Sequence, residues 1–207
     1  TFNDSTSPTP EWKPGSLGAD FPETVVDLGP DPDGEGTVVA TVVKYAPPGA
    51  DGAGFTSRPA VLWIHGMSDY FFQDHVAREL HEAGYAFYAV DLRKCGRSRR
   101  EGQRWHHVAD LSLYDVDLDA TAALILGAGH PTLSPLAHST GGLVAALWLD
   151  GLRERDPEMH SKIPGAMLNS PWLDLQYPRM QRAVVKLAAK VMARRAPDRL
   201  TPHKGLG

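Results

Sequence analysis

The chain has 207 residues, a formal net charge of −4 and one cysteine, and 42% of its residues are hydrophobic. That length allows one domain with a sizeable core, and the mixed charge argues against a nucleic-acid surface. No apolar run has the length of a membrane span, and a single cysteine excludes an intrachain disulfide, which fits a reducing, cytoplasmic compartment.

The N-terminal part of the chain predicts an arm followed by a β-hairpin. Residues 1–20 are polar and proline-rich, so we expect a flexible arm before a core at 21–175. Two β-branched runs at 24–28 and 37–45 flank a Gly- and Asp-rich turn. They predict an antiparallel hairpin at a sheet edge, and 47–59 is expected to be a loop.

From residue 60 onward, short apolar runs alternate with helical segments. Continuous apolar strands separated by helices are typical of a parallel sheet covered on both faces. Ligands bind such sheets beyond the carboxyl ends of the strands. The predicted strands are 60–64, 86–90, 132–137 and 163–168, and the predicted helices are 72–83, 113–126, 141–154 and 178–195.

Ser139 stands between a predicted strand and a predicted helix. Ala137 precedes it by two positions and Gly141 follows it by two, which is the G-x-S-x-G nucleophile-elbow pattern with alanine in the first slot. Small neighbours let two backbones approach closely, and the turn lifts the hydroxyl clear of the sheet. We therefore predict that Ser139 is a nucleophile. The alternative is a glycine-rich turn whose serine has no chemical role.

A second polar sequence, His65-Gly66-Met67, follows the predicted strand 60–64. The glycine allows a tight turn that leaves the next amide free to face a pocket. The Met67 and Thr140 N–H groups are thus predicted to form an oxyanion hole. The alternative is a plain strand-to-helix turn, and His65 is expected to bond loop backbone.

The loop 91–98 is densely charged and follows the predicted strand 86–90. We expect a scaffold in which Asp91 anchors amides and Arg97 pairs with acids. The basic neighbours of Cys95 favour a lowered thiol pKa, but Ser139 is the better nucleophile.

His106 and His107 are adjacent, so their rings point in different directions on most backbones. This spacing predicts a surface or loop pair, and the sequence predicts no metal site.

Together these motifs resemble the α/β-hydrolase superfamily, in its serine-aminopeptidase, monoacylglycerol-lipase and lysophospholipase-like branch. The resemblance covers about 24–175 and implies an α/β-hydrolase core with a mostly parallel sheet, a helical cap, no cofactor, and a Ser–Asp–His esterase or lipase. It is carried by His65-Gly66, Asp91-Leu92-Arg93-x-x-Gly96-Arg97-Ser98, Ala137-His138-Ser139-Thr140-Gly141-Gly142 and Asn169-Ser170-Pro171.

The family order is serine, then acid, then histidine. After Ser139, the pair Asp174 and His203 is formally allowed, although His203 lies in a tail without a strand to fix it. We expect instead a fold truncated at the start of a cap, 176–207, with the His–Asp pair in a missing C-terminal part. Expressed alone, the 207 residues should be aggregation-prone or partner-bound and inactive on esters.

The expected reaction is hydrolysis of carboxylic esters with an apolar acyl part, such as monoacylglycerols, lysophospholipids or small esters. Tyr70-Phe71-Phe72 and Trp172 are candidate walls of the acyl pocket. The helix 178–195 has an apolar face and a basic face, suited either to packing or to contact with a lipid surface. The alternatives are a peptidase or acyltransferase on the same machinery, or a non-catalytic binding protein.

Overall fold

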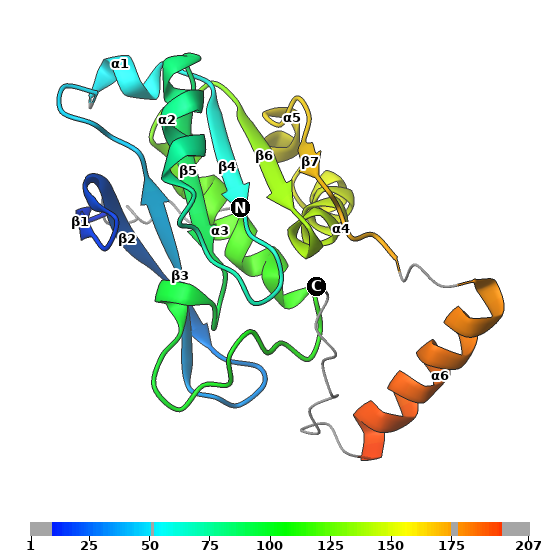
Figure 1. Cartoon of the computed structure of the whole chain (residues 1–207). Coiled ribbons are helices and arrows are strands. Elements are labelled where there is room, and N and C mark those ends of the chain that lie inside the picture. Colours follow the sequence, from blue (N-terminus) through cyan, green and yellow to red (C-terminus); the bar gives the residue numbers. More distant parts are fainter. Residues whose placement is uncertain (1–9, 51, 175–177, 196–207) are drawn as a thin grey trace. The chain divides into compact units, whose positions relative to one another are not determined.

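The computed structural model describes residues 10–50, 52–174 and 178–195 (Figure 1). The chain divides into two units, one ending at Trp172 and the other beginning at Leu173. The second unit contains one described helix, α6 (Arg179–Arg195), where the sequence predicts it. No helix in these described ranges is long and apolar enough to cross a bilayer.

The first unit is built on a seven-stranded sheet in the order β1-β2-β3-β5-β4-β6-β7. The strands from β1 to β5 in that order pair antiparallel, and those from β5 to β7 pair parallel. The predicted hairpin and the predicted parallel strands of the core are therefore confirmed. The strands are β1 (Lys13–Gly15), β2 (Gly18–Pro30), β3 (Thr37–Lys44), β4 (Ala60–Ile64), β5 (Ala86–Asp91), β6 (Leu133–His138) and β7 (Met167–Asn169).

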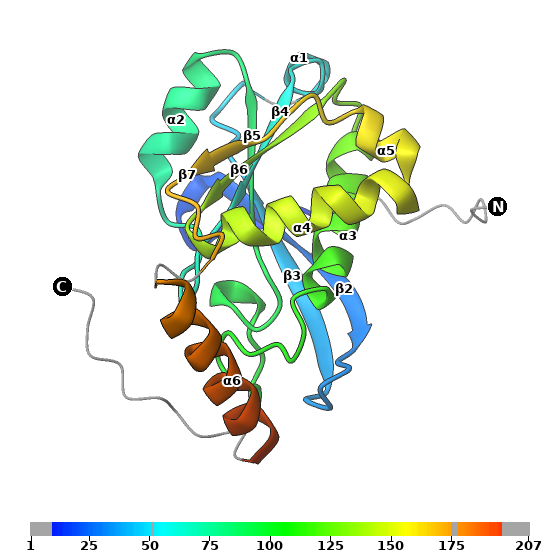
Figure 2. The ribbon, with the colours of Figure 1, turned by 90° about the vertical axis from the view of Figure 1, so that its right-hand side faces the viewer.

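Helices cover both faces of this sheet, as Figures 1 and 2 show. Because side chains alternate along a strand, β4 buries Leu62 and Ile64 on one face and Trp63 on the other. The Leu62 face packs against α3 and α4, which contribute Trp148, and the Trp63 face packs against α2, which contributes Ala77. The helices of this unit are α1 (Ala53–Thr56), α2 (Asp74–Glu82), α3 (Leu113–Gly127), α4 (Thr140–Arg155) and α5 (Pro157–Ser161), with a 3-10 turn at Gly96–Ser98.

The N-terminal segment differs from its prediction. Strand β1 and the first residues of β2 fall within 1–20, and β1, rather than the hairpin, forms the edge of the sheet. The polar composition of this segment gives no strand pattern, because only single apolar side chains anchor the segment to the sheet. The Trp12 ring lies 4.3 Å from Lys44 Nζ, and Leu17 packs on the α2-side core. Residues 1–9 of the expected arm lie outside the described residues.

Two short helices and one short strand also depart from the predictions. Helix α1 lies within the expected loop 47–59, and α5 follows α4 directly. The sequence carried a signal for α5: Asp156 accepts a hydrogen bond from the Met159 N–H, with proline in the first turn. Strand β7 spans only Met167–Asn169, because residues 163–166, which follow the turn after α5, do not pair as a strand.

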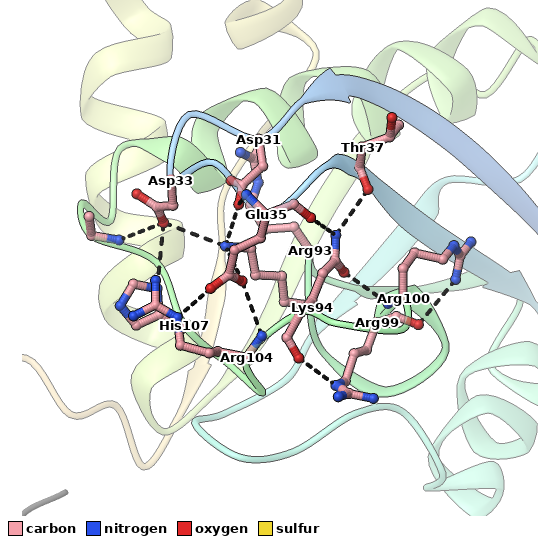
Figure 3. Close-up of polar contacts among 12 residues, drawn as sticks. Asp31, Asp33, Glu35, Thr37, Arg93, Lys94, Arg99, Arg100, Arg104 and His107 are labelled. Atoms are coloured by element: carbon pink, nitrogen blue, oxygen red, sulfur yellow. Dashed lines mark hydrogen bonds and ion pairs between the residues drawn. The ribbon is translucent and has the colours of Figure 1, made fainter. Parts of the chain in front are cut away.

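A buried charge cluster joins the β2–β3 turn to the loop after β5 (Figure 3). The Lys94 side chain is fully buried, and its Nζ lies 2.6 Å from Asp31, 3.0 Å from Glu35 and 3.6 Å from Asp33. Desolvation opposes ionisation of Glu35, but hydrogen bonds from Arg104 and Lys94 outweigh it and lower the Glu35 pKa from 4.5 to about 2. Ion pairs therefore connect the β2–β3 turn to the loop after β5.

Acid is expected to weaken the ion pairs of this buried charge cluster and so to lower the stability of the fold. Because the Glu35 pKa is lower in the folded state, its stabilisation is complete above pH 4.5 and is lost as the pH falls towards about 2. We expect a loss on the order of 1–2 kcal/mol after solvent screening. Urea unfolding at about pH 6 and about pH 3 measures it. Glu35→Gln should reduce the pH dependence and exposed Glu101→Gln should not; equal pH dependence in all three proteins would contradict the assignment.

Candidate functional site

Ser139 occupies the turn between β6 and α4, with φ 53° and ψ −121°. A positive φ is costly for a residue with a side chain, so the surrounding contacts must hold it. The Ser139 N–H donates to the Asn169 carbonyl at 3.1 Å, and the Ser139 carbonyl accepts from Gly142 at 3.0 Å and Trp172 at 2.9 Å. The turn is thus fixed by the first turn of α4, by the end of β7 and by the chain that follows β7.

Close backbone packing requires small residues near Ser139. A Cβ at Gly141 would lie 2.4 Å from the His65 carbonyl oxygen and 2.7 Å from that of Ile64. A Cβ at Gly66 would lie 3.2 Å from the Ser139 Cβ. The start of α4 therefore presses on the end of β4, as a strained turn with small neighbours requires.

The Met67 and Thr140 amides have no acceptor among the residues that the structure describes. Met67 follows the glycine turn after β4, and Thr140 begins α4. Both residues line one cavity. Their role as an oxyanion hole stays a prediction, and their free N–H groups meet its first requirement.

A cavity of about 210 Å³ opens beside this turn, between the ends of the parallel strands and α3 and α4. Its wall includes Thr140 and Gly141, which directly follow Ser139, and most of the rest is apolar. The lining residues are His65, Gly66, Met67, Ser68, Leu92, Cys95, His106, Val108, Leu111, Tyr114, Thr140, Gly141, Leu143, Val144 and Trp172. The cavity is suited to an apolar chain with a reacting group near the serine.

The expected aromatic wall is only partly found. Trp172 lines the cavity, but Tyr70, Phe71 and Phe72 do not. Phe71 is fully buried in the core between the sheet and α2, while Tyr70 and Phe72 are exposed. Alternation along the extended segment after β4 separates the three rings, so the apolar wall comes instead from Val108, Leu111, α3 and α4.

The two predicted scaffold groups are confirmed. The Leu92 N–H donates to His65 Nε2 at 3.1 Å, so the hydrogen is on Nδ1, which lies 2.7 Å from the Gly66 carbonyl. Asp91 accepts from the Phe71 N–H at 3.0 Å and from the Arg97 N–H at 2.9 Å. The Arg97 guanidinium also pairs with Asp91 at 2.8 Å. These bonds fix the strand-end loops around the cavity.

Cys95 departs from its prediction. Burial, reinforced by the nearby Asp91 and Asp117 carboxylates, raises the pKa of the Cys95 thiol to about 12. The basic residues beside it in sequence direct their charges elsewhere: Lys94 into the carboxylate cluster, and Arg97 onto Asp91. Cys95 is therefore an uncharged wall residue, not a thiolate.

The sequence predicts a surface or loop position for His106, but the structure places it in the cavity wall. Its backbone φ is 54°, and its N–H donates to the Lys94 carbonyl at 3.1 Å. No motif or spacing marks it, because its position depends on contacts far away in sequence. Within the described ranges, no group of three or more metal-ligating side chains occurs.

The remaining candidates for the acid and the base are Asp174 and His203. Asp174 belongs to the second unit, and His203 lies outside the described residues. The compact triad stays a prediction.

The chain matches the family described as serine aminopeptidase, S33, over residues 56–206. No curated protein sequence matches the chain.

Solved structures show the same fold at low identity. A monoglyceride lipase from Saccharomyces cerevisiae is 20% identical, with a TM-score of 0.54 over 97% of this chain and 57% of that one. A carboxyl esterase from Bacillus coagulans is 14% identical, with a TM-score of 0.60 over 86% and 52%. A brefeldin A esterase is 16% identical, with a TM-score of 0.53 over 80% and 44%. The chain spans about half the length of these structures.

Proposed function

Because the chain belongs to the serine aminopeptidase family of the α/β-hydrolase superfamily, we propose that it is a serine hydrolase that cleaves carboxylic esters with an apolar acyl part. The observation that carries this proposal is the position of Ser139. Its strained turn stands beside an apolar cavity whose wall holds two amides without acceptors in the described chain. This arrangement fits a nucleophile elbow with its oxyanion hole.

In the proposed reaction, Ser139 Oγ attacks the ester carbonyl and transfers its proton to a histidine base. The Met67 and Thr140 N–H groups hold the oxyanion that forms. The alcohol leaves with the proton from the histidine, and an acyl-enzyme remains. Water, deprotonated by the same histidine, then attacks the acyl carbon and releases the acid and Ser139. We propose that the intact protein supplies this histidine and its acid partner.

The apolar wall supports an ester with an acyl chain over the second candidate, an aminopeptidase. The family description favours a peptidase, since it names a serine aminopeptidase. Such an enzyme must hold a substrate ammonium group, normally with a carboxylate. The wall of the described cavity contains no aspartate or glutamate, so an uncharged acyl chain is the better fit.

The intact protein is expected to hydrolyse medium-chain p-nitrophenyl esters or monoacylglycerols at least tenfold faster than aminoacyl amides. The reason is that burying an ammonium group in this wall leaves it unpaired, which costs more than one factor of ten in binding. Parallel kcat/KM measurements on the two substrate classes check this. A preference for aminoacyl amides would favour the peptidase.

The proposal also covers where the protein lies in the cell and what helix α6 contacts. The single cysteine of the chain is free and buried, which supports a cytoplasmic location. Helix α6 carries Val184, Leu187 and Val191 at spacings that share one face, which supports contact with a lipid surface or with other parts of the protein.

A further inference from the structure

The wall of the cavity beside Ser139 has an exposed part and a buried part. Three of its side chains are more than a third exposed and mark the mouth: Met67, Leu111 and Trp172. Four apolar side chains are less than a tenth exposed and mark the inner end: Leu92, Cys95, Tyr114 and Val144. A straight chain that enters at the mouth therefore stops at this inner end.

The inner end is backed by core rather than by solvent. Its four side chains belong to the hydrophobic core between the sheet and helices α3 and α4. Leu118, one turn beyond Tyr114 on α3, is fully buried in the same core. Because protein cores are packed as densely as organic crystals, an acyl chain cannot pass this end without displacing core side chains.

Tyr114 and Cys95 hold each other in place at the inner end. Their side chains hydrogen-bond each other, which satisfies polar atoms that burial takes away from water. Burial also raises the pKa of both groups, so neither carries a charge near pH 7. The bonded pair therefore forms a neutral end for an apolar chain.

A buried ion pair fixes the two elements that carry this pair. The Arg93 N–H and Arg93 Nε each donate to an Asp117 carboxylate oxygen at 2.7 Å, and the two side chains are 2% and 0% exposed. Asp117 follows Tyr114 by three residues on α3, and Arg93 precedes Cys95 by two. Because breaking a buried ion pair is costly, the inner end cannot retreat from a longer chain.

We propose that Tyr114 is a specificity-determining residue whose ring closes the inner end of the acyl cavity and sets the longest straight acyl chain that the site accepts. Each methylene that fits before the ring adds buried apolar area, so affinity rises about fourfold per carbon. A further methylene meets the packed core, so the gain stops. The reaction in this inference rests on the proposed ester hydrolysis, whereas the limit on the length of a bound chain does not.

The test separates binding from hydrolysis. Straight-chain alkanoates from butanoate to dodecanoate are titrated into the intact Ser139→Ala protein by calorimetry. The p-nitrophenyl esters of the same acids are assayed with the intact Ser139 protein. Affinity and kcat/KM are expected to rise with chain length up to one acid and then to stop rising or fall, and that acid defines the chain-length limit.

Variants of Tyr114, made in both proteins, identify the residue responsible. Tyr114→Ala should move the limit to acids about two or more carbons longer, and the first acid past the parent limit should bind about tenfold more tightly than it binds the parent. Tyr114→Leu, a milder change in the core, should move the limit in the same direction. Tyr114→Phe keeps the ring and loses only the hydroxyl, so its limit should equal that of the parent.

Tyr45→Leu is the matched control for the loss of a buried ring. Tyr45 is 6% exposed in the core on the α2 side of the sheet, and it does not line the cavity. This variant should therefore lose stability in thermal melts and keep the parent limit.

The inference is overturned if no alkanoate binds, if affinity in the Ser139→Ala protein keeps rising through dodecanoate, or if folded Tyr114→Ala and Tyr114→Leu proteins keep the parent limit. A limit that moves as far in Tyr114→Phe or Tyr45→Leu also overturns it. If the limit moves as expected but the Ser139→Ala protein still hydrolyses the esters, the proposed nucleophile fails and the inference about Tyr114 stands.

Discussion

Ser139→Ala is expected to abolish labelling of the intact protein by a fluorophosphonate probe and to lower its esterase kcat by a factor of about 10⁴ or more. The probe reacts only with a serine whose hydroxyl is activated and exposed to a pocket. Ser139 stands on a turn with φ 53°, directly before the cavity residues Thr140 and Gly141. Gel fluorescence of the labelled protein, with ester hydrolysis measured in parallel, checks both effects.

A surface serine is the matched control for this substitution. Ser161 Oγ donates to the Glu158 carbonyl at 2.7 Å on α5, outside the cavity wall, so Ser161→Ala should keep full labelling and activity. Thermal melts of both variants should match the parent protein, because alanine removes only an oxygen. Persistent labelling in a folded Ser139→Ala protein would show that another residue is the nucleophile.

Gly141→Ala is expected to cause a large loss of stability. The new Cβ would lie 2.4 Å and 2.7 Å from two carbonyl oxygens of the β4 end. Strand β4 is paired on both sides, with β5 and β6, so it cannot move away without breaking the sheet. We expect the free energy of unfolding to fall by about 3 kcal/mol or more, measured by urea denaturation.

Gly127→Ala provides the comparison. Gly127 is the last residue of α3, and a Cβ there would meet nothing within 4 Å. Alanine is the better helix former, so this variant should be as stable as the parent or up to about 1 kcal/mol more stable. Equal denaturation midpoints for Gly141→Ala and Gly127→Ala would contradict the close approach of α4 to β4.

Ser139→Ala and Gly141→Ala both change residues at the edge of the sheet where the parallel strands end. The turn after β4 supplies Gly66 and Met67, and the turn after β6 supplies Ser139. Since β4 and β6 are adjacent and in parallel register, with Ile64 opposite Ala137, the two turns meet. This geometry explains why residues more than seventy positions apart in sequence line one cavity.

The sequence by itself determined the central strands, most of the helices and the small residues around Ser139. These features are local: an apolar run, a helical period and a pair of small residues at fixed spacing carry their own signal. The scaffold roles of His65 and Asp91 were also predictable, because a polar residue directly after a buried strand must satisfy the backbone of the turn it enters.

Only the tertiary structure decided the composition of the cavity and the roles of Lys94, Cys95 and His106. Lys94 is buried because three carboxylates from the β2–β3 turn surround it, some sixty residues away in sequence. His106 lines the cavity because that cluster holds its loop. Long-range electrostatic and packing contacts leave no periodic pattern in the sequence, since the folded chain alone brings their partners together.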